Sequence, residues 1–158
     1  MIGLWGTTLG NIIMTLMISM VPVIELRGAI PIAVANGLDV NIALITSIIG
    51  NLIPVPIIIL FVRKVFAWMR GKSKHLANLV ERFERKAEKH SDKVYRYEWW
   101  GLMILVAIPL PGTGAWTGAL VAAMLDMRLK RAFPAIFLGV VLAGIIVSYI
   151  TYGASVLF

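Results

Sequence analysis

Cysteine is absent from this 158-residue chain, and charged residues are scarce. Without cysteine the chain can form no disulfide, carry out no thiol catalysis and build no cysteine-based metal site. Charged residues make up 15% of the sequence and hydrophobic residues 59%, and the mean hydropathy is +0.88. A soluble domain of this size could not bury so much apolar surface. The composition therefore indicates an integral membrane protein.

The positive charge is concentrated in one segment. Eleven of the fifteen Lys and Arg residues lie between Arg63 and Arg96, so the formal net charge of +7 is mostly a local feature. The sequence contains no recognisable nucleic-acid module, and basic loops beside apolar spans usually mark the cytoplasmic side of a membrane. We therefore expect segment 63–98 to be cytoplasmic and expect no nucleic acid partner.

Four long stretches contain no charged residue: Met1–Ile24, Val40–Val62, Trp99–Leu125 and Ala132–Phe158. The first lacks a basic start and a small-residue cleavage site, so we expect it to be retained. Val40–Val62 and Ala132–Phe158 read as plain spanning helices. Asp39 and Asp126 precede them and are expected to cap them.

The sequences "ELRGAIP" (Glu25–Pro31) and "PLPGTGAWTG" (Pro109–Gly118) interrupt the apolar pattern. Proline removes a backbone donor and glycine loosens a helix, so each break frees polar backbone groups. Lipid cannot satisfy such groups, and a break at membrane depth needs protein or water around it. The breaks are therefore either the buried tips of re-entrant hairpins or ordinary turns at the membrane surface.

An internal repeat and the charge pattern favour buried tips. When the chain is shifted by 87 positions, Pro22 falls on Pro109 and Asp39 on Asp126. If Trp99–Leu125 enters and leaves on one side, the basic segment 128–131 lies in the cytoplasm, as the positive-inside rule requires. The sequence thus predicts one all-α membrane domain over 1–158 with two inverted repeats, 1–62 and 99–158. Each repeat is a re-entrant helical hairpin followed by a transmembrane helix, which is a transporter architecture.

The connector 63–98 joins the two repeats. Within it, apolar residues recur at alternating spacings of four and three from Leu76 to Tyr97, which predicts a long amphipathic cytoplasmic helix over about Lys74–Glu98. Such a helix can lie on anionic lipid or pair with a second copy of the chain.

Glu25 and Arg27 are the strongest candidates for a functional site, because charged residues within a membrane are costly. Arg27 offers a planar fork of donors to a phosphate or carboxylate, and Glu25 can take up and release a proton. The structural alternative is an ion pair that fixes the hairpin tip. The second tip offers exposed amides and hydroxyls as an anion cradle. The predicted substrate- and proton-binding residues are Glu25, Arg27, Gly28, Pro31, Asn51, Pro111, Gly112, Thr113, Gly114 and Thr117.

The chain has no recognisable nucleophile–base pair or metal-ligand cluster among its membrane residues, so we expect no enzymatic activity, metal or cofactor. "ELRGAIPIA", "PLPGTGAWTG" and the charged helix between them resemble the small multidrug export protein family. That family is similar in architecture to the DedA superfamily, which is associated with proton-dependent transport and with flipping of polyprenyl-phosphate lipids. The resemblance implies an acidic role at the tip for Glu25 and a basic role for Arg27. This chain departs from the DedA pattern at its second tip, which carries no charge.

The sequence therefore predicts a small multi-pass transporter of the cytoplasmic (inner) membrane of a prokaryote. We expect it to contact membrane lipids and to move an anionic, polyprenyl-phosphate-like lipid or a small amphiphile, coupled to protons. Irregular backbone must not face lipid, so a homo-oligomer, most simply a dimer, is expected. Two alternatives stay open: a multidrug exporter, and a non-transporting membrane scaffold or assembly factor whose basic helix binds a partner.

Overall fold

The structure is a computed structural model that describes residues 6–75, 77–78, 80–81, 98–110 and 113–153. Its regular elements over these residues are α-helices, which confirms the predicted all-α class. They are α1 (Thr8–Met20), α2 (Glu25–Ala35), α3 (Val40–Leu52), α4 (Pro54–Lys72), α6 (Glu98–Ala107), α7 (Ala115–Met124) and α8 (Leu129–Tyr152).

Two helical stretches are long and apolar enough to cross a membrane. They are Val40–Lys72, which runs through α3 and α4 over 33 residues, and α8 with 24 residues. Roughly 20 residues suffice for a hydrocarbon core of about 30 Å. Both stretches therefore have the length and composition of transmembrane helices.

The first of these stretches extends ten residues beyond the predicted end at Val62. Only Ile53 separates α3 from α4. Pro54 stands at the first position of α4, where the N–H that proline lacks would have no partner within the helix in any case. The start of the predicted connector therefore continues α4 as far as Lys72. Most of the predicted helix over 74–98 lies outside the described residues.

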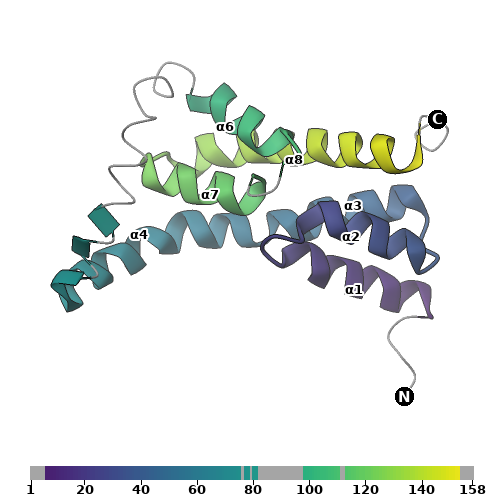
Figure 1. Cartoon of the computed structure of the whole chain (residues 1–158), viewed down its shortest axis with the longest axis horizontal. Coiled ribbons are helices and arrows are strands. Elements are labelled where there is room, and N and C mark those ends of the chain that lie inside the picture. Colours follow the sequence, from purple (N-terminus) through teal and green to yellow (C-terminus); the bar gives the residue numbers. More distant parts are fainter. Residues whose placement is uncertain (1–5, 76, 79, 82–97, 111–112, 154–158) are drawn as a thin grey trace.

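The short helices form two hairpins. α1 and α2 pack on each other and on α3, whereas α6 and α7 pack on each other and on α8, and α7 also packs on α4. Figure 1 shows the two hairpins coming from opposite ends of the long helices, so that their turns lie side by side near the middle. This arrangement brings the two breaks of the sequence together.

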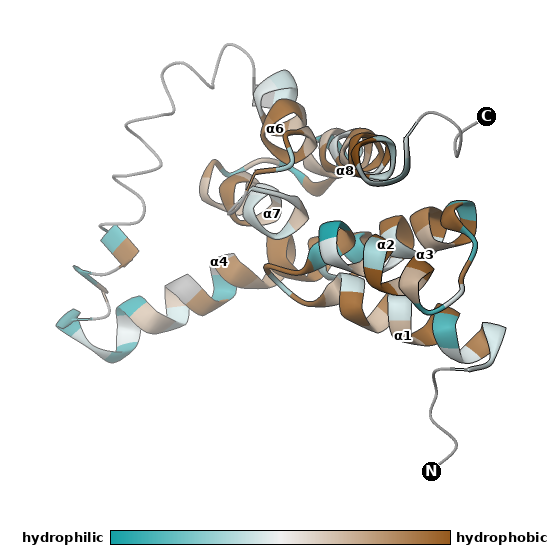
Figure 2. Ribbon diagram, turned by 45° about the vertical axis from the view of Figure 1, so that its right-hand side comes forward, coloured by the Kyte–Doolittle hydropathy of each residue, from teal (hydrophilic) through white to brown (hydrophobic). Residues whose placement is uncertain are grey.

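Many large apolar side chains are exposed, and several polar ones are buried. Large apolar side chains are exposed along the long helices, among them Ile45, Phe61 and Ile150, while Thr15, Ser47 and Ser148 are fully buried. Figure 2 shows hydrophobic residues spread over α3, α6 and α8 and hydrophilic ones gathered at the end of α4. Apolar surface on this scale fits contact with lipid.

The first break lies four residues upstream of its predicted position. Residues 21–24 form the turn, with Val23 at φ 80°, and α2 begins at Glu25, so the sequence "ELRGAIP" lies within a helix. Pro31 lies inside α2, where its ring removes one backbone donor without ending the helix. The second break is close to its predicted place, because 108–114 separate α6 from α7.

The two aspartates precede their helices differently. Asp39 caps α3, as predicted, by accepting a hydrogen bond from the amide of Asn41 at 2.9 Å. α8 begins with Arg128 at its N-cap position and has no side-chain cap, so the prediction for Asp126 is wrong. The chain turns once more after Asp126, which has φ 61°, before α8 starts.

Candidate functional site

The candidate site lies where the turn at 21–24 meets the turn at 108–114. Every helix end leaves backbone groups without an intrahelical partner: amides at the start and carbonyls at the end. Four such ends meet here, from α1, α2, α6 and α7. Their polar groups need partners because lipid offers none.

Glu25 supplies partners for the start of α7. This residue is the first of α2 and is 3% exposed. Its Oε1 accepts a hydrogen bond from the amide of Trp116 at 3.2 Å. The N-cap residue of α7 is Gly114, which has no side chain to offer. The carboxylate of Glu25 therefore caps α7 from the other hairpin, where the positive end of the helix dipole favours its charge.

Arg27 serves the turn that follows α6 in a similar way. Its guanidinium donates to the carbonyls of Leu110 and, at 3.2 Å, Ile108, and to the Thr113 hydroxyl at 2.9 Å. That hydroxyl donates in turn to the carbonyl of Ile108 or Leu110, at 2.6 and 2.8 Å. A planar fork suits this task because its several donors reach different acceptors at once. The two charged side chains thus bond to the two sides of the same turn, Arg27 to the side that follows α6 and Glu25 to the side that starts α7.

The second hairpin also bonds to the first through a side chain of its own. The indole Nε1 of Trp116 donates to the carbonyl of Met20, the last residue of α1, at 3.0 Å. The carbonyl end of α1 is therefore satisfied by α7, as the amide end of α7 is satisfied by α2. The two tips hold each other through both side chains and backbone.

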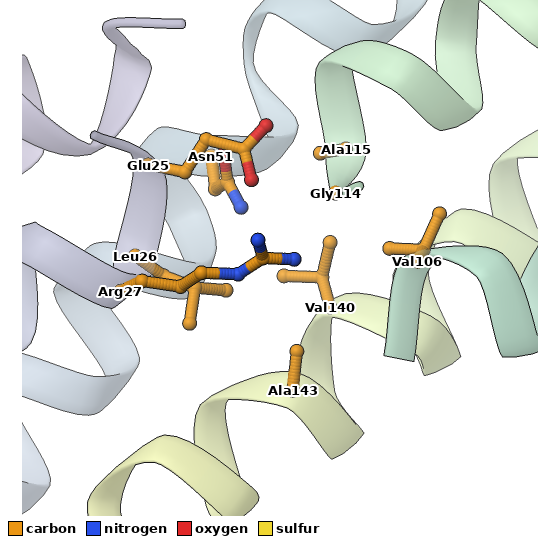
Figure 3. Close-up of a pocket in the computed structure, with 9 residues that line it drawn as sticks. All are labelled: Glu25, Leu26, Arg27, Asn51, Val106, Gly114, Ala115, Val140 and Ala143. Carbon is orange, nitrogen blue, oxygen red and sulfur yellow. The ribbon is translucent and has the colours of Figure 1, made fainter. Parts of the chain in front are cut away.

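A small pocket remains between the tips. It is lined by Glu25, Leu26, Arg27, Asn51, Val106, Gly114, Ala115, Val140 and Ala143. Its empty volume of about 150 Å³ includes open solvent, and the lining side chains leave no space for a water molecule. Figure 3 shows the side chains of Glu25, Arg27 and Asn51 pointing into the space that Gly114 and Ala115 close. In this conformation the two tips close directly on each other, so a substrate group could enter only if the tips moved apart.

Asn51 is the unexpected member of this pocket. Its side chain is 1% exposed, and neither its Nδ2 nor its Oδ1 has a hydrogen-bond partner among the described residues. The Nε of Arg27 is also buried without a partner. An unpaired buried amide costs about 1–3 kcal/mol. Unused donors and an unused acceptor therefore face a pocket that already holds a carboxylate.

Several predicted site residues come together here and others do not. Glu25, Arg27, Asn51 and Gly114 line the pocket, and Thr113 bonds to Arg27. Gly28, Pro31 and Thr117 are not among the lining residues. Pro111 and Gly112 lie outside the described residues.

Sequence reasoning missed the role of Ala115 and Trp116. Their backbone amides start α7, and Trp116 adds its indole bond to α1. Backbone amides leave no signature in a sequence, but the absence of Ser, Thr, Asp or Asn at position 114 is informative. A buried helix start without its own cap predicts a cap from elsewhere in the chain.

Comparison with known families gives one match. The family model described as Putative small multi-drug export protein matches residues 25–146, from Glu25 in the first tip to within α8. Comparisons with curated proteins and with solved structures gave no match. Over the described residues, no group of three or more His, Asp or Glu side chains is placed to hold a metal ion.

Proposed function

Because this chain belongs to the putative small multi-drug export protein family, we propose that it is a small membrane transporter whose substrate and proton site is the pocket between the two hairpin tips. The observation that carries the proposal is the position of Glu25 and Arg27. They are the two charged residues of that pocket and lie where two interrupted helical hairpins meet. Ionisable groups at such a place mark substrate and proton pathways. The proposal involves no enzymatic step.

We propose an anionic lipid, polyprenyl-phosphate-like, or a small anionic amphiphile as the substrate. Arg27 and the amides at the start of α7 suit a phosphate or carboxylate. Large apolar side chains exposed on α3 and α8, such as Ile49 and Leu142, offer a surface for a hydrocarbon tail. The architectural similarity that we expect between this family and DedA-like proteins points to the same substrate class and to a prokaryotic inner-membrane location.

Transport further requires that the tips separate. In this proposal both hairpins are re-entrant and belong to inverted repeats, and the present conformation is the closed one, since its pocket is small. Opening would break the bonds of Glu25, Arg27 and Trp116 across the tips. Alternation between two openings around one fixed site is the mechanism that such repeats serve.

The family description favours a second candidate, the export of small drug-like molecules. The two candidates differ in the charge of what is moved. An anionic headgroup fits Arg27 and the α7 amides, whereas many amphiphilic drugs are cationic and would need Glu25 alone. The charge preference of transport therefore decides between them.

Reconstitution into liposomes tests the proposal. A fluorescent dialkyl phosphate and a cationic amphiphile with matched tails are placed in one leaflet, and their loss is followed with and without a pH gradient. We expect gradient-dependent movement of the phosphate only. The matched control is Asp39→Asn, which changes an exposed acid that caps α3 outside the pocket. Movement of the cation alone would favour drug export, and movement of neither would favour a scaffold or assembly factor.

We also propose a homodimer. The turn at 21–24 is exposed throughout, with Val23 94% exposed, and Ile108 and Leu110 in the other turn are exposed as well. Irregular backbone in lipid needs a protein cover, and a second copy is the simplest one. Mass measurement in mild detergent or lipid nanodiscs tests this, and an active particle with the mass of one chain would contradict it.

A further inference from the structure

The carboxylate of Glu25 occupies the part of the pocket that suits an anion. Its Oε1 accepts the amide of Trp116, and a Cβ on Gly114 would lie 2.6 Å from its Cδ. The carboxylate therefore lies directly against the bare backbone that starts α7. Only a glycine at 114 allows an anionic group to approach this helix start so closely.

We propose that Glu25 is a built-in competitor of the substrate, so that a proton on Glu25 frees the anion site and an anion on the site requires that proton. This inference rests on the proposed function, because it assumes that the substrate carries an anionic group. The charge on Glu25 decides whether its own carboxyl group or the substrate occupies the anion site. A carboxylate binds helix-start amides well, whereas a neutral carboxylic acid is a weaker acceptor and gains nothing from the helix dipole.

The other groups in the pocket fit this exchange. Arg27 Nε and Asn51 Nδ2 are buried donors without partners, and both residues line the pocket that holds the carboxylate. Glu25 leaves these donors unused. The oxygens of a phosphate point in tetrahedral directions, whereas those of a carboxylate lie in one plane, so a phosphate can bind the α7 amides and these spare donors together. Asn51 Oδ1, the unused acceptor, can then take a hydrogen bond from the protonated Glu25.

Two anions cannot share this pocket. Arg27 is its one positive residue, and no further titratable side chain is among those that line it. Of the helices packed around the tips, α1, α3 and α7 contain no titratable residue, and those of α4 are Arg63, Lys64, Arg70 and Lys72, from its tenth residue onward. Those of α6 and α8 are Glu98 at the start of α6, Lys130 and Arg131 in the first turn of α8, and Tyr149 and Tyr152 in its last turn. A second negative charge beside Glu25 would therefore be unfavourable.

Proton counting during binding tests the inference. The wild-type protein in phosphatidylcholine nanodiscs is titrated with dihexyl phosphate in two buffers that have different heats of ionisation, at a series of pH values. The uncharged trihexyl phosphate is the matched probe. We expect uptake of about one proton per dihexyl phosphate bound where Glu25 is ionised, with affinity falling about tenfold per pH unit there. For Glu25→Gln we expect no proton uptake and an affinity that does not vary with pH.

The outcomes separate this inference from the proposed function. Binding of dihexyl phosphate to the wild type without proton uptake would overturn the inference and leave an anion transporter. An unchanged proton count in Glu25→Gln would also overturn it, because another group would then carry the proton. No binding at any pH, or equal binding of trihexyl phosphate, would overturn both. The wild-type count needs no variant, so poor folding of Glu25→Gln would not affect it, and Asp39→Asn should match the wild type.

Discussion

Glu25 Oε1 accepts a hydrogen bond from the backbone amide of Trp116, 91 positions away, at 3.2 Å. One carboxylate thereby completes the start of a helix that belongs to the other hairpin. A buried acid whose only role was to carry protons would not need this hydrogen bond. An acid whose only role was to cap the helix would not need to lie in a pocket with unpaired donors. The position of Glu25 therefore suits both a structural and a functional role, and substitutions can separate the two.

Glu25→Gln should change function more than folding. Glutamine keeps an oxygen that can accept the Trp116 amide, so only the charge assistance of that bond is lost, about 1–2 kcal/mol of stability. Transport should persist weakly and no longer respond to a pH gradient. The measurements are thermal unfolding in detergent and the liposome assay, with Asp39→Asn as the control. A normal pH response in Glu25→Gln would rule out Glu25 as the proton carrier.

Arg27→Lys should lower both stability and apparent substrate affinity while leaving the pH response in place. A lysine keeps the charge but cannot reach Ile108, Leu110 and Thr113 together, so at least one carbonyl at the end of α6 loses its donor. The expected loss of stability is about 1–3 kcal/mol. Substrate titrations in the liposome assay measure the affinity. An unchanged affinity would remove Arg27 from the substrate site.

The double substitution Glu25→Gln/Arg27→Gln distinguishes capping from a simple ion pair. In an ion pair, removal of both charges restores the folded yield that each single change loses. Here the two side chains serve different helix ends, so the double variant should lose at least as much as the worse single variant. A restored yield with normal transport would mean that the charges support the fold only.

The sequence was sufficient to predict part of the site, namely Glu25, Arg27, Asn51, Thr113 and Gly114, but not how these residues bond. Charge-free runs and Pro/Gly breaks predicted an all-helical chain with long spans, and a charged residue in an apolar run marked Glu25 and Arg27. The sequence did not show that Pro22 and not Pro31 lies at the turn, because a proline within a helix and one at its end look alike until packing is known. The end of α4 was missed because the predicted span stopped before the first charged residue, Arg63, whereas the helix continues to Lys72. The inverted repeat and the re-entrant hairpins stay predictions.

Gly114→Ala should destabilise the tips. Gly114 has φ 133°, which side-chain-bearing residues rarely adopt, and a Cβ there would overlap with the carboxylate of Glu25. We expect a loss of about 1–3 kcal/mol from the strained backbone, together with loss of the Glu25 cap. Gly71→Ala is the matched control, because Gly71 lies in α4 and a Cβ there meets nothing within 4 Å. It should leave stability equal or higher by about 0.5–1 kcal/mol. Equal thermal unfolding of the two variants would contradict the packing at the tips.

Trp116→Phe should weaken the link between the second hairpin and α1. Phenylalanine keeps most of the ring but cannot donate to the carbonyl of Met20. The expected loss is about 1–3 kcal/mol, since the carbonyl is left without its donor. Trp100→Phe is the control, because Trp100 is exposed. Heating followed by size-exclusion chromatography measures both without relying on tryptophan fluorescence. A loss for Trp100→Phe as large as for Trp116→Phe would mean that the indole bond adds nothing.

Topology is open to a direct test because the chain contains no cysteine. Lys72 ends α4 and Lys130 lies in the first turn of α8, whereas Asp39 precedes α3, and all three are exposed. Figure 1 shows the end of α4 and the start of α8 toward one end of the molecule, and the connection between α2 and α3 toward the other. Single cysteines at 72 and 130 should therefore react with a membrane-impermeant maleimide from one side of the membrane, and a cysteine at 39 from the other. By the positive-inside rule, the side of 72 and 130 is the cytoplasm.

If 72 and 130 react from opposite sides, the α6–α7 hairpin crosses the membrane instead of returning. The opposed tips, and the shared site that Glu25 and Arg27 would form there, could not then exist as proposed.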